Sequence, residues 1–76
     1  MITALVADDD ASSANVMREL LESTGKIRVI GEASDGTQCL RMCAEMSPDA
    51  LFLDIRMPRV SGIDVAERVM AMPDPP

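Results

Sequence analysis

Histidine is absent from this 76-residue chain, and aromatic side chains are nearly absent, with one phenylalanine and no tyrosine or tryptophan. Without histidine there is no imidazole base or nucleophile and no histidine ligand for zinc. Basic residues are scarce too, since seven Lys and Arg stand against 13 Asp and Glu, for a net charge of −6. Nucleic-acid phosphates are bound by clustered basic side chains, so we expect no nucleic-acid contact by this segment.

Long hydrophobic runs are also missing. No apolar stretch approaches the roughly 20 residues of a membrane span, and the N-terminus lacks the basic flank and apolar core of a signal peptide. We therefore expect a cytoplasmic protein without membrane contact. The hydrophobic share of 47% is too high for a disordered chain. A chain this short buries only about 60–65% of its surface, so we expect one folded domain of marginal stability.

The two cysteines, Cys39 and Cys43, lie four residues apart on a predicted helix. Side chains at this spacing are neighbours, but a strain-free disulfide between them is difficult to form. We interpret both as small apolar residues that face the core. A zinc site built on these thiols would need ligands from another chain, because this one has no histidine.

Apolar stretches of strand length alternate with stretches of helical periodicity. Strands are predicted over residues 2–7, 27–33 and 50–53. The first helix begins at residues 10–13 and is closed by Gly25, the second covers 38–46 and is stopped by Pro48, and the third runs from about 63 to 72. Apolar residues recur at helical spacing in the first helix (Val16, Met17, Leu20, Leu21) and are expected on the inner face of the second (Leu40, Cys43, Ala44).

Strands that alternate with helices of this length favour right-handed crossovers and a parallel sheet with helices on both faces. The sequence therefore predicts an α/β fold in the order strand, helix, repeated three times. Residues 51–53 are apolar on both faces, which is typical of a central strand. The usual doubly wound order, 2-1-3, would instead place this third strand at an edge.

Two of the predicted strands end abruptly in carboxylates. Residues 5–10 read LVADDD, and residues 51–58 read LFLDIRMP. Because the carboxyl ends of parallel strands meet at the ligand-binding edge of a sheet, we expect Asp8, Asp9 and Asp54 to converge there. Converging carboxylates repel one another unless a cation or a proton lies between them. The pattern predicts a divalent-metal site with one carboxylate left to react.

These two segments, together with GEASDG at residues 31–36 and SG at 61–62, resemble the receiver domain of two-component response regulators. The motifs occur in the family's order and spacing over essentially the whole chain. The resemblance implies a flavodoxin-like, doubly wound parallel sheet, truncated here to three strands in the order 2-1-3 with three helices.

The resemblance also implies roles for individual residues. Asp54 would be the phosphoacceptor, and Mg²⁺ would be bound by Asp8, Asp9, Asp54 and the backbone carbonyl of Arg56. The loop after the phosphoacceptor would be shaped by Met57, Pro58 and Gly62. We interpret Asp10 as the N-cap of the first helix before considering it a ligand.

The implied partner is a histidine kinase or a phosphotransfer protein. The receiver itself catalyses the transfer, so it is not an enzyme in the ordinary sense. The chemistry is consistent with the residues, because a carboxylate attacks phosphorus efficiently only when positive charge offsets its repulsion from the phosphoryl oxygens.

The chain departs from the family in its number of repeats. A complete receiver has five, whereas residues 1–76 hold three, and MPDPP at 72–76 resembles the loop before the fourth strand. The family's Ser/Thr of the fourth strand and lysine of the fifth have no counterpart, so phosphorylation of this chain alone should be slow or undetectable. An exposed third-strand edge should lead to a homodimer or higher assembly, by edge pairing or by exchange of elements.

Two alternatives stay open. The chain could be a binding-only pseudo-receiver that captures a partner strand at its open edge. The Asp-x-Asp pattern at residues 8–10 also fits a Mg²⁺-dependent phosphohydrolase of the haloacid-dehalogenase type, with Asp8 as nucleophile and Asp10 as acid/base. That second alternative leaves the conspicuous motif at residues 54–58 unexplained.

Overall fold

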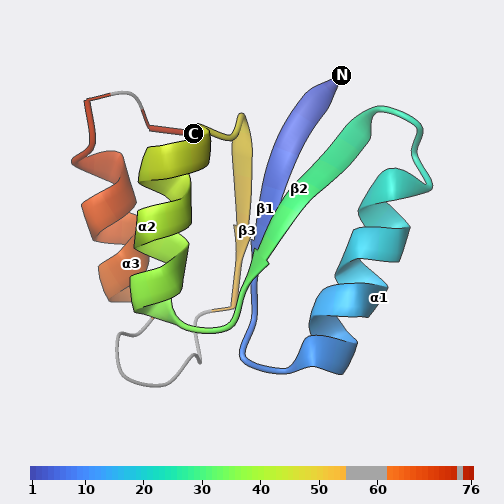
Figure 1. Ribbon diagram of the computed structural model, residues 1–76, viewed down its shortest axis with the longest axis horizontal. Helices are drawn as coiled ribbons and strands as arrows, with labels where there is room; N and C mark the ends of the chain where they lie inside the picture. The colour runs from blue at the N-terminus through green and yellow to red at the C-terminus, as the bar shows by residue number, and fades with distance from the viewer. Residues whose placement is uncertain (55–61, 74) are drawn as a thin grey trace.

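The fold is known from a computed structural model, which describes residues 1–54, 62–73, 75 and 76. Within these ranges strands and helices alternate along the chain (Figure 1), in the order β1 (Ile2–Ala7), α1 (Ala11–Glu22), β2 (Ile27–Ala33), α2 (Gly36–Met46), β3 (Ala50–Leu53) and α3 (Gly62–Met70). The helix α1 lies on one face of the sheet, and α2 and α3 lie on the other. The strand positions and the alternating order agree with the sequence prediction.

The sheet is parallel and has the strand order β2-β1-β3, as the resemblance implied. The central strand β1 pairs with β2 from Ile2 opposite Ile27 to Ala7 opposite Ala33, and with β3 over residues 4–7. The β1–β2 ladder shifts register once, so that Ile30 is skipped. Within the described part of the chain, β3 is therefore an edge strand despite its apolar sequence.

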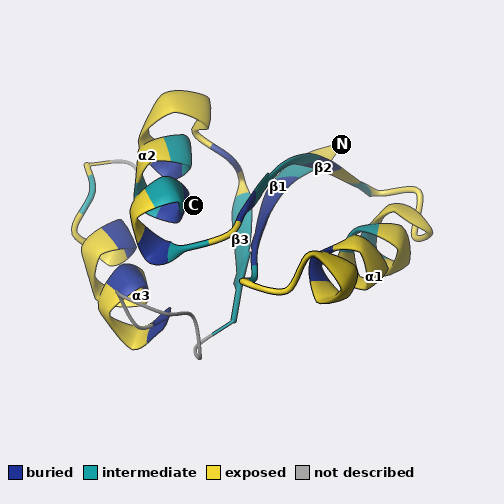
Figure 2. Ribbon diagram, turned by 60° about the horizontal axis from the view of Figure 1, so that its bottom comes forward, coloured by how far each residue is buried: buried dark blue, intermediate teal, exposed yellow. Residues whose placement is uncertain are grey.

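The larger part of the core lies between the sheet and the pair α2 and α3. Because side chains alternate along a strand, Leu5 and Ala7 point to this face, whereas Val6 points to the other. The buried residues of this cluster, among those described, are Leu5, Ala7, Ala33, Cys39, Cys43, Val65 and Val69. Figure 2 shows the buried positions of α2 and α3 turned toward one another and toward the sheet.

The second helix begins two residues earlier than predicted, and the set of its residues that faces the core differs slightly from the predicted set. The Asp35 carboxylate accepts the backbone N–H of Gln38 (2.8 Å), and the Gln38 side chain accepts the N–H of Ser34 (2.8 Å), which stabilises the first turn. The prediction that Ala44 faces inward is wrong, because Ala44 is exposed while Cys43 is buried. At about 100° per residue, a neighbour of a core position points well away from the core.

The first helix, α1, packs on the sheet through fewer buried residues than α2 and α3 do. Its one fully buried residue among those described is Ala14, which packs with Val6 and Val29, next to the partly buried Leu21 and Phe52. The apolar residues that predicted the helix are mostly exposed: Val16 is 57% and Leu20 is 61% accessible. The helix ends at Glu22, and Gly25 follows in a left-handed conformation (φ +73°).

Candidate metal centre

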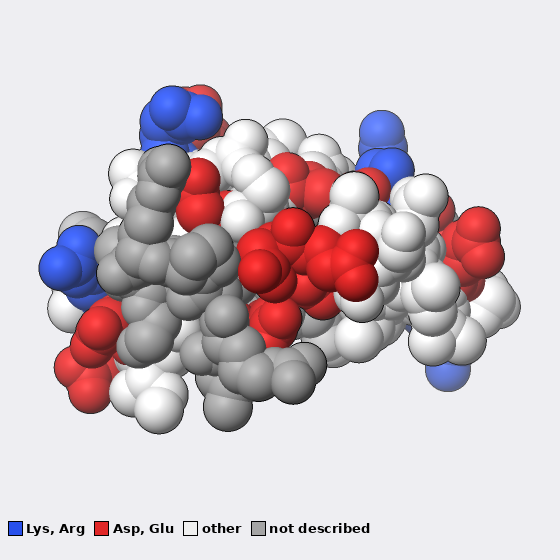
Figure 3. Space-filling view, turned by 90° about the horizontal axis from the view of Figure 1, so that it is seen from below, with Lys and Arg blue, Asp and Glu red and all other residues white. Residues whose placement is uncertain are grey.

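Three carboxylates meet where β1 and β3 end. Asp8, Asp9 and Asp54 each place one oxygen within 4.8 Å of the others. The backbone holds them there, since the Asp8 N–H donates to Ala33 O and the Asp54 N–H donates to Ala7 O, both at 2.9 Å. Figure 3 shows the acidic side chains of this end gathered into one patch, with the visible Lys and Arg side chains toward the rim. The convergence expected from the strand ends is observed.

Asp10, the third acidic residue of the run, is the N-cap of α1, as predicted. Its carboxylate accepts the N–H of Ser12 (3.0 Å) and the hydroxyl of Ser13 (3.1 Å). Its backbone oxygen accepts the first helical hydrogen bond, from Ala14 N–H (3.0 Å). A carboxylate at this position satisfies donors that the first turn would leave unpaired. This geometry does not favour the alternative in which Asp10 serves as an acid/base group.

The carboxylates line an open hollow of about 340 Å³ that is accessible from solvent. Asp8 and Asp54 are half-buried in it, whereas Asp9 is exposed. Ser13 also lines the hollow, although no motif in the sequence singles it out as a site residue. The Asp8 carboxylate accepts the N–H of Asp10 (3.0 Å), which ties the side chain to its own loop. The hollow is large enough for a small ion.

A second hollow of about 340 Å³ adjoins the first and is mainly apolar. Asp8 and Asp54 lie on its border with the acidic hollow, and its other lining residues come from both sheet and helix: Val6, Met17, Phe52 and Leu53. The acidic site is therefore flanked by apolar surface on the α1 face of the sheet. Such a flank lowers the local dielectric constant and strengthens interactions between charges at its border.

The three carboxylates fit a hard divalent cation. Mg²⁺ binds six oxygens at about 2.0–2.1 Å, which places ligand oxygens roughly 3–4 Å apart, and it keeps several waters. Oxygens that already lie within 4.8 Å of one another need little movement to reach this geometry. Without a cation or a proton between them, these carboxylates repel one another.

Some of the predicted site residues lie outside the described part of the chain. These are Arg56, with its backbone carbonyl, and the loop residues Met57 and Pro58. Gly62 is described and is the buried first residue of α3. The roles proposed for these four residues stay predictions.

The two thiols are structural, as predicted. Cys39 and Cys43 are both free and buried. Burial raises the pKa of Cys39 to about 12, with a further contribution from the neighbouring Cys43, and burial also raises the pKa of Cys43. Thiols that stay protonated at neutral pH are poor nucleophiles and poor metal ligands. The acidic hollow is therefore a stronger candidate for a reactive site than the two thiols.

No helix among the described residues combines the length and the apolar character that a membrane crossing requires.

Known proteins match this chain over nearly its full length. The family model of the response regulator receiver domain matches residues 4–76. An uncharacterized response regulatory protein of Vibrio parahaemolyticus is 45% identical over 65 residues, which cover 86% of this chain and 27% of that protein. The protein-glutamate methylesterase/protein-glutamine glutaminase of Pyrococcus horikoshii is 36% identical over 69 residues, which cover 91% of this chain and 19% of that protein.

Solved structures show the same fold. The response regulator domain of Thermotoga maritima CheB superposes with a TM-score of 0.92 at 31% identity, over 99% of this chain and 56% of that one. The chain thus spans less than a third of these two curated relatives and 56% of this solved domain. The flavodoxin-like receiver fold expected from the motifs is confirmed. This chain belongs to the response regulator receiver domain family of two-component systems.

Proposed function

We propose that this chain is a phosphoacceptor segment of a response regulator, in which Asp54 receives a phosphoryl group and Asp8, Asp9 and Asp54 bind Mg²⁺. The observation that supports the proposal most strongly is the convergence of one oxygen from each of these carboxylates within 4.8 Å. In this proposal the backbone carbonyl of Arg56 is a further ligand. Met57, Pro58 and Gly62 shape the adjoining loop.

The proposed reaction is an in-line displacement at phosphorus. An Asp54 carboxylate oxygen forms a bond to the phosphorus of a phosphohistidine, the P–N bond breaks, and the leaving imidazole keeps the electron pair and takes a proton from solvent. Mg²⁺ bound at this site would supply positive charge to the phosphoryl oxygens. The hydrogen bond from Asp54 N–H to Ala7 O fixes the backbone of Asp54, the proposed nucleophile, at the end of β3.

The donor in this proposal is a histidine kinase or a phosphotransfer protein, and the reaction takes place in the cytoplasm. We expect transfer to this chain alone to be slow, because no position of the sequence matches the hydroxyl and the lysine of complete receivers. Each missing contact of this kind costs on the order of 2–4 kcal/mol in the transition state, by analogy with single oxyanion donors.

We also propose that the chain assembles through β3, by edge pairing or by exchange of elements. Leu51, Phe52 and Leu53 are only half-buried in the described structure, and β3 pairs on one side only. An apolar edge strand is a template for pairing with another chain. Sedimentation equilibrium is expected to show a dimer or a larger assembly, whereas a stable folded monomer would contradict the proposal.

Mass spectrometry after incubation with Mg²⁺ and acetyl phosphate tests the phosphoacceptor role. An acyl phosphate reduced with borohydride is expected to map to Asp54, and Asp54→Asn should abolish it. Asp10→Asn is the matched control. It neutralises a carboxylate at the same end of the sheet, but this carboxylate caps α1 and is not the proposed phosphoacceptor. Labelling at Asp8 would support the phosphohydrolase alternative. Absence of label would support a binding-only role only if the incubation is long enough to detect transfer slowed by the loss of both contacts, with a complete receiver labelled in parallel.

A further inference from the structure

Little apolar surface holds α1 against the sheet. Of its residues only Ala14 is fully buried, whereas Val16 and Leu20 are more than half accessible. The helix nevertheless begins immediately after Asp8–Asp10, and Asp10 is its N-cap. The loop that carries these carboxylates therefore joins β1 directly to α1.

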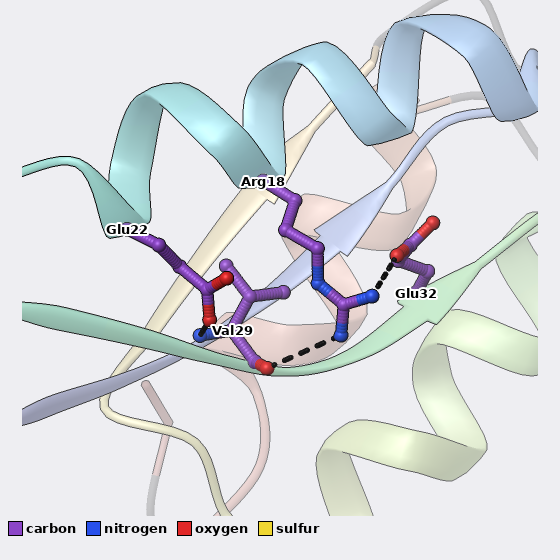
Figure 4. Close-up of polar contacts among 4 residues, drawn as sticks. All are labelled: Arg18, Glu22, Val29 and Glu32. Atoms are coloured by element: carbon purple, nitrogen blue, oxygen red, sulfur yellow. Dashed lines mark hydrogen bonds and ion pairs between the residues drawn. The ribbon is translucent and has the colours of Figure 1, made fainter.

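Polar side chains of α1 bind the backbone of β2 instead, as Figure 4 shows. The Arg18 guanidinium donates to Val29 O (3.4 Å), and the Glu22 carboxylate accepts Val29 N–H (3.2 Å). Both polar groups of this one backbone residue are thus bound by a single helix. The second Nη of Arg18 forms an ion pair with Glu32 (2.8 Å). We call Arg18, Glu22 and Glu32 together the α1 clamp.

The α1 clamp lies along the segment of β2 that leads to the acidic site. Val29 precedes Ile30, the residue that the β1–β2 ladder skips, so the backbone is least regular there. Glu32 precedes Ala33, whose carbonyl accepts the Asp8 N–H at 2.9 Å. One end of the clamp is therefore a single residue away from the hydrogen bond that holds Asp8.

We propose that Arg18 is a positioning residue for the acidic site: through the α1 clamp it holds α1, and with it the Asp8–Asp10 loop, in register with β2. A planar guanidinium suits this role because it binds the Val29 carbonyl and the Glu32 carboxylate in one fixed geometry. The ion pair is only partly exposed, with side chains 39% and 28% accessible, so solvent screens it less than a surface pair. The effect on Mg²⁺ rests on the function proposed above, whereas the effect on the loop does not.

Amide hydrogen exchange by NMR tests the proposal in the full chain. Arg18→Met keeps the length of the side chain and removes both contacts. It should speed exchange several-fold at Asp8 and Ala14, whose N–H groups bind Ala33 O and Asp10 O. Exchange at Asp49, at the opposite end of the sheet, should stay unchanged. Arg18→Lys, which keeps the charge but not the planar fork, should have an intermediate effect.

Thr3→Val is the matched control, because it removes a hydroxyl that hydrogen-bonds to Asp49 at the end of the sheet away from the carboxylates. It should speed exchange at Asp49 and leave Asp8 and Ala14 unchanged. Mg²⁺ affinity, measured by calorimetry, should fall roughly 3–10-fold in Arg18→Met, below the loss for direct supporters of metal ligands. The affinity of Thr3→Val should equal that of the unaltered chain.

The outcomes separate this inference from the proposed function. If Arg18→Met speeds exchange while the unaltered chain binds no Mg²⁺, the metal assignment fails and the positioning role stands. If Asp8 and Ala14 exchange at unchanged rates, or respond equally to Thr3→Val, the positioning role is overturned. Should Arg18→Met fail to fold, the same comparison is made with Arg18→Lys and Glu32→Gln, and unchanged exchange in both would overturn it.

Discussion

Among the described residues, seven buried ones pack into one cluster on the face of the sheet covered by α2 and α3, whereas the face covered by α1 has a cluster of three. The first face is stabilised by the removal of apolar surface from water. On the second face, side-chain contacts to the backbone of β2 supplement a small apolar contact. The acidic loop begins on β1 and leads into α1, so it belongs to the face with less packing.

This difference suggests a division of roles between the two faces. A well-packed face resists local opening, whereas a face held by few apolar contacts opens at lower free energy. In the described structure the acidic site lies beside the less packed face. Changes on the α2 and α3 face should therefore affect global stability, and changes on the α1 face should affect the site.

The same substitution on the two faces should give the largest contrast. Leu5→Ala removes a fully buried side chain from the larger cluster, and we expect it to lower the free energy of unfolding by about 3 kcal/mol. Leu20→Ala, at a position that is 61% exposed, should change it by less than about 0.5 kcal/mol. Urea denaturation followed by circular dichroism measures both. Equal losses would show that the α1 face is packed as closely as the other.

Gly31 tests how closely α2 packs on the sheet. A Cβ at this position would lie 2.5 Å from Met42 Cε and 2.9 Å from Leu5 Cδ2. We expect Gly31→Ala to cost about 1–2 kcal/mol in urea denaturation, because a buried leucine and a methionine end must both shift. The double variant Gly31→Ala with Met42→Ala should lose less than the sum of the single variants. Strict additivity would show that Met42 does not cause the cost.

The two ends of the sheet differ as well, since among the described residues the one cluster of three carboxylates lies where β1 and β3 end. We expect Asp9→Asn to raise the free energy of unfolding by roughly 0.5–1 kcal/mol at low ionic strength without Mg²⁺, because it relieves repulsion from Asp8 and Asp54. The gain should shrink in 0.5 M NaCl, where screening is strong. A gain that is independent of salt would point to a cause other than repulsion.

The smallest expected effect on stability is that of a substitution at Asp49, at the opposite end of the sheet. Hydrogen bonds from the Thr3 N–H (2.9 Å) and hydroxyl (3.0 Å) hold the pKa of its carboxyl below the ordinary value. A lowered folded-state pKa means that the stabilisation is present above the unfolded-state value and is lost as the pH falls below about 4. Asp49→Asn should therefore lose less stability than the unaltered chain between pH 4 and pH 2. If the free energy of unfolding falls equally with pH in Asp49→Asn and in the unaltered chain, this account is contradicted.

Much of the fold could be predicted from the sequence because it depends on local patterns. Apolar runs identified the strands, and the Asp-Asp-Asp run indicated both a cap and a site, with Asp10 as the cap. The prediction of which α2 residues face the core is wrong at Ala44, because periodicity alone does not fix the rotation of a helix to within one residue. The exposed apolar residues of α1 show the same limit, since spacing identifies a helix but not what covers it.

The contacts that hold the site could not be predicted. Arg18 and Glu32 are 14 residues apart, and their pairing depends on how α1 lies across β2 and on a ladder irregularity at Ile30. No local pattern encodes such a contact. The convergence of Asp8 and Asp9 with Asp54 was predictable because parallel topology brings strand ends together whatever the details of packing.

Paramagnetic broadening by Mn²⁺ in two-dimensional NMR tests the metal assignment most directly, because Mn²⁺ shares the oxygen ligands and octahedral geometry of Mg²⁺. We predict that substoichiometric Mn²⁺ broadens the amide signals of Asp8, Asp9 and Asp54 first, that excess Mg²⁺ restores them, and that Asp49 is unaffected. Broadening spread evenly over the acidic residues, Asp49 included, would show that the three carboxylates form no common site and would contradict the account.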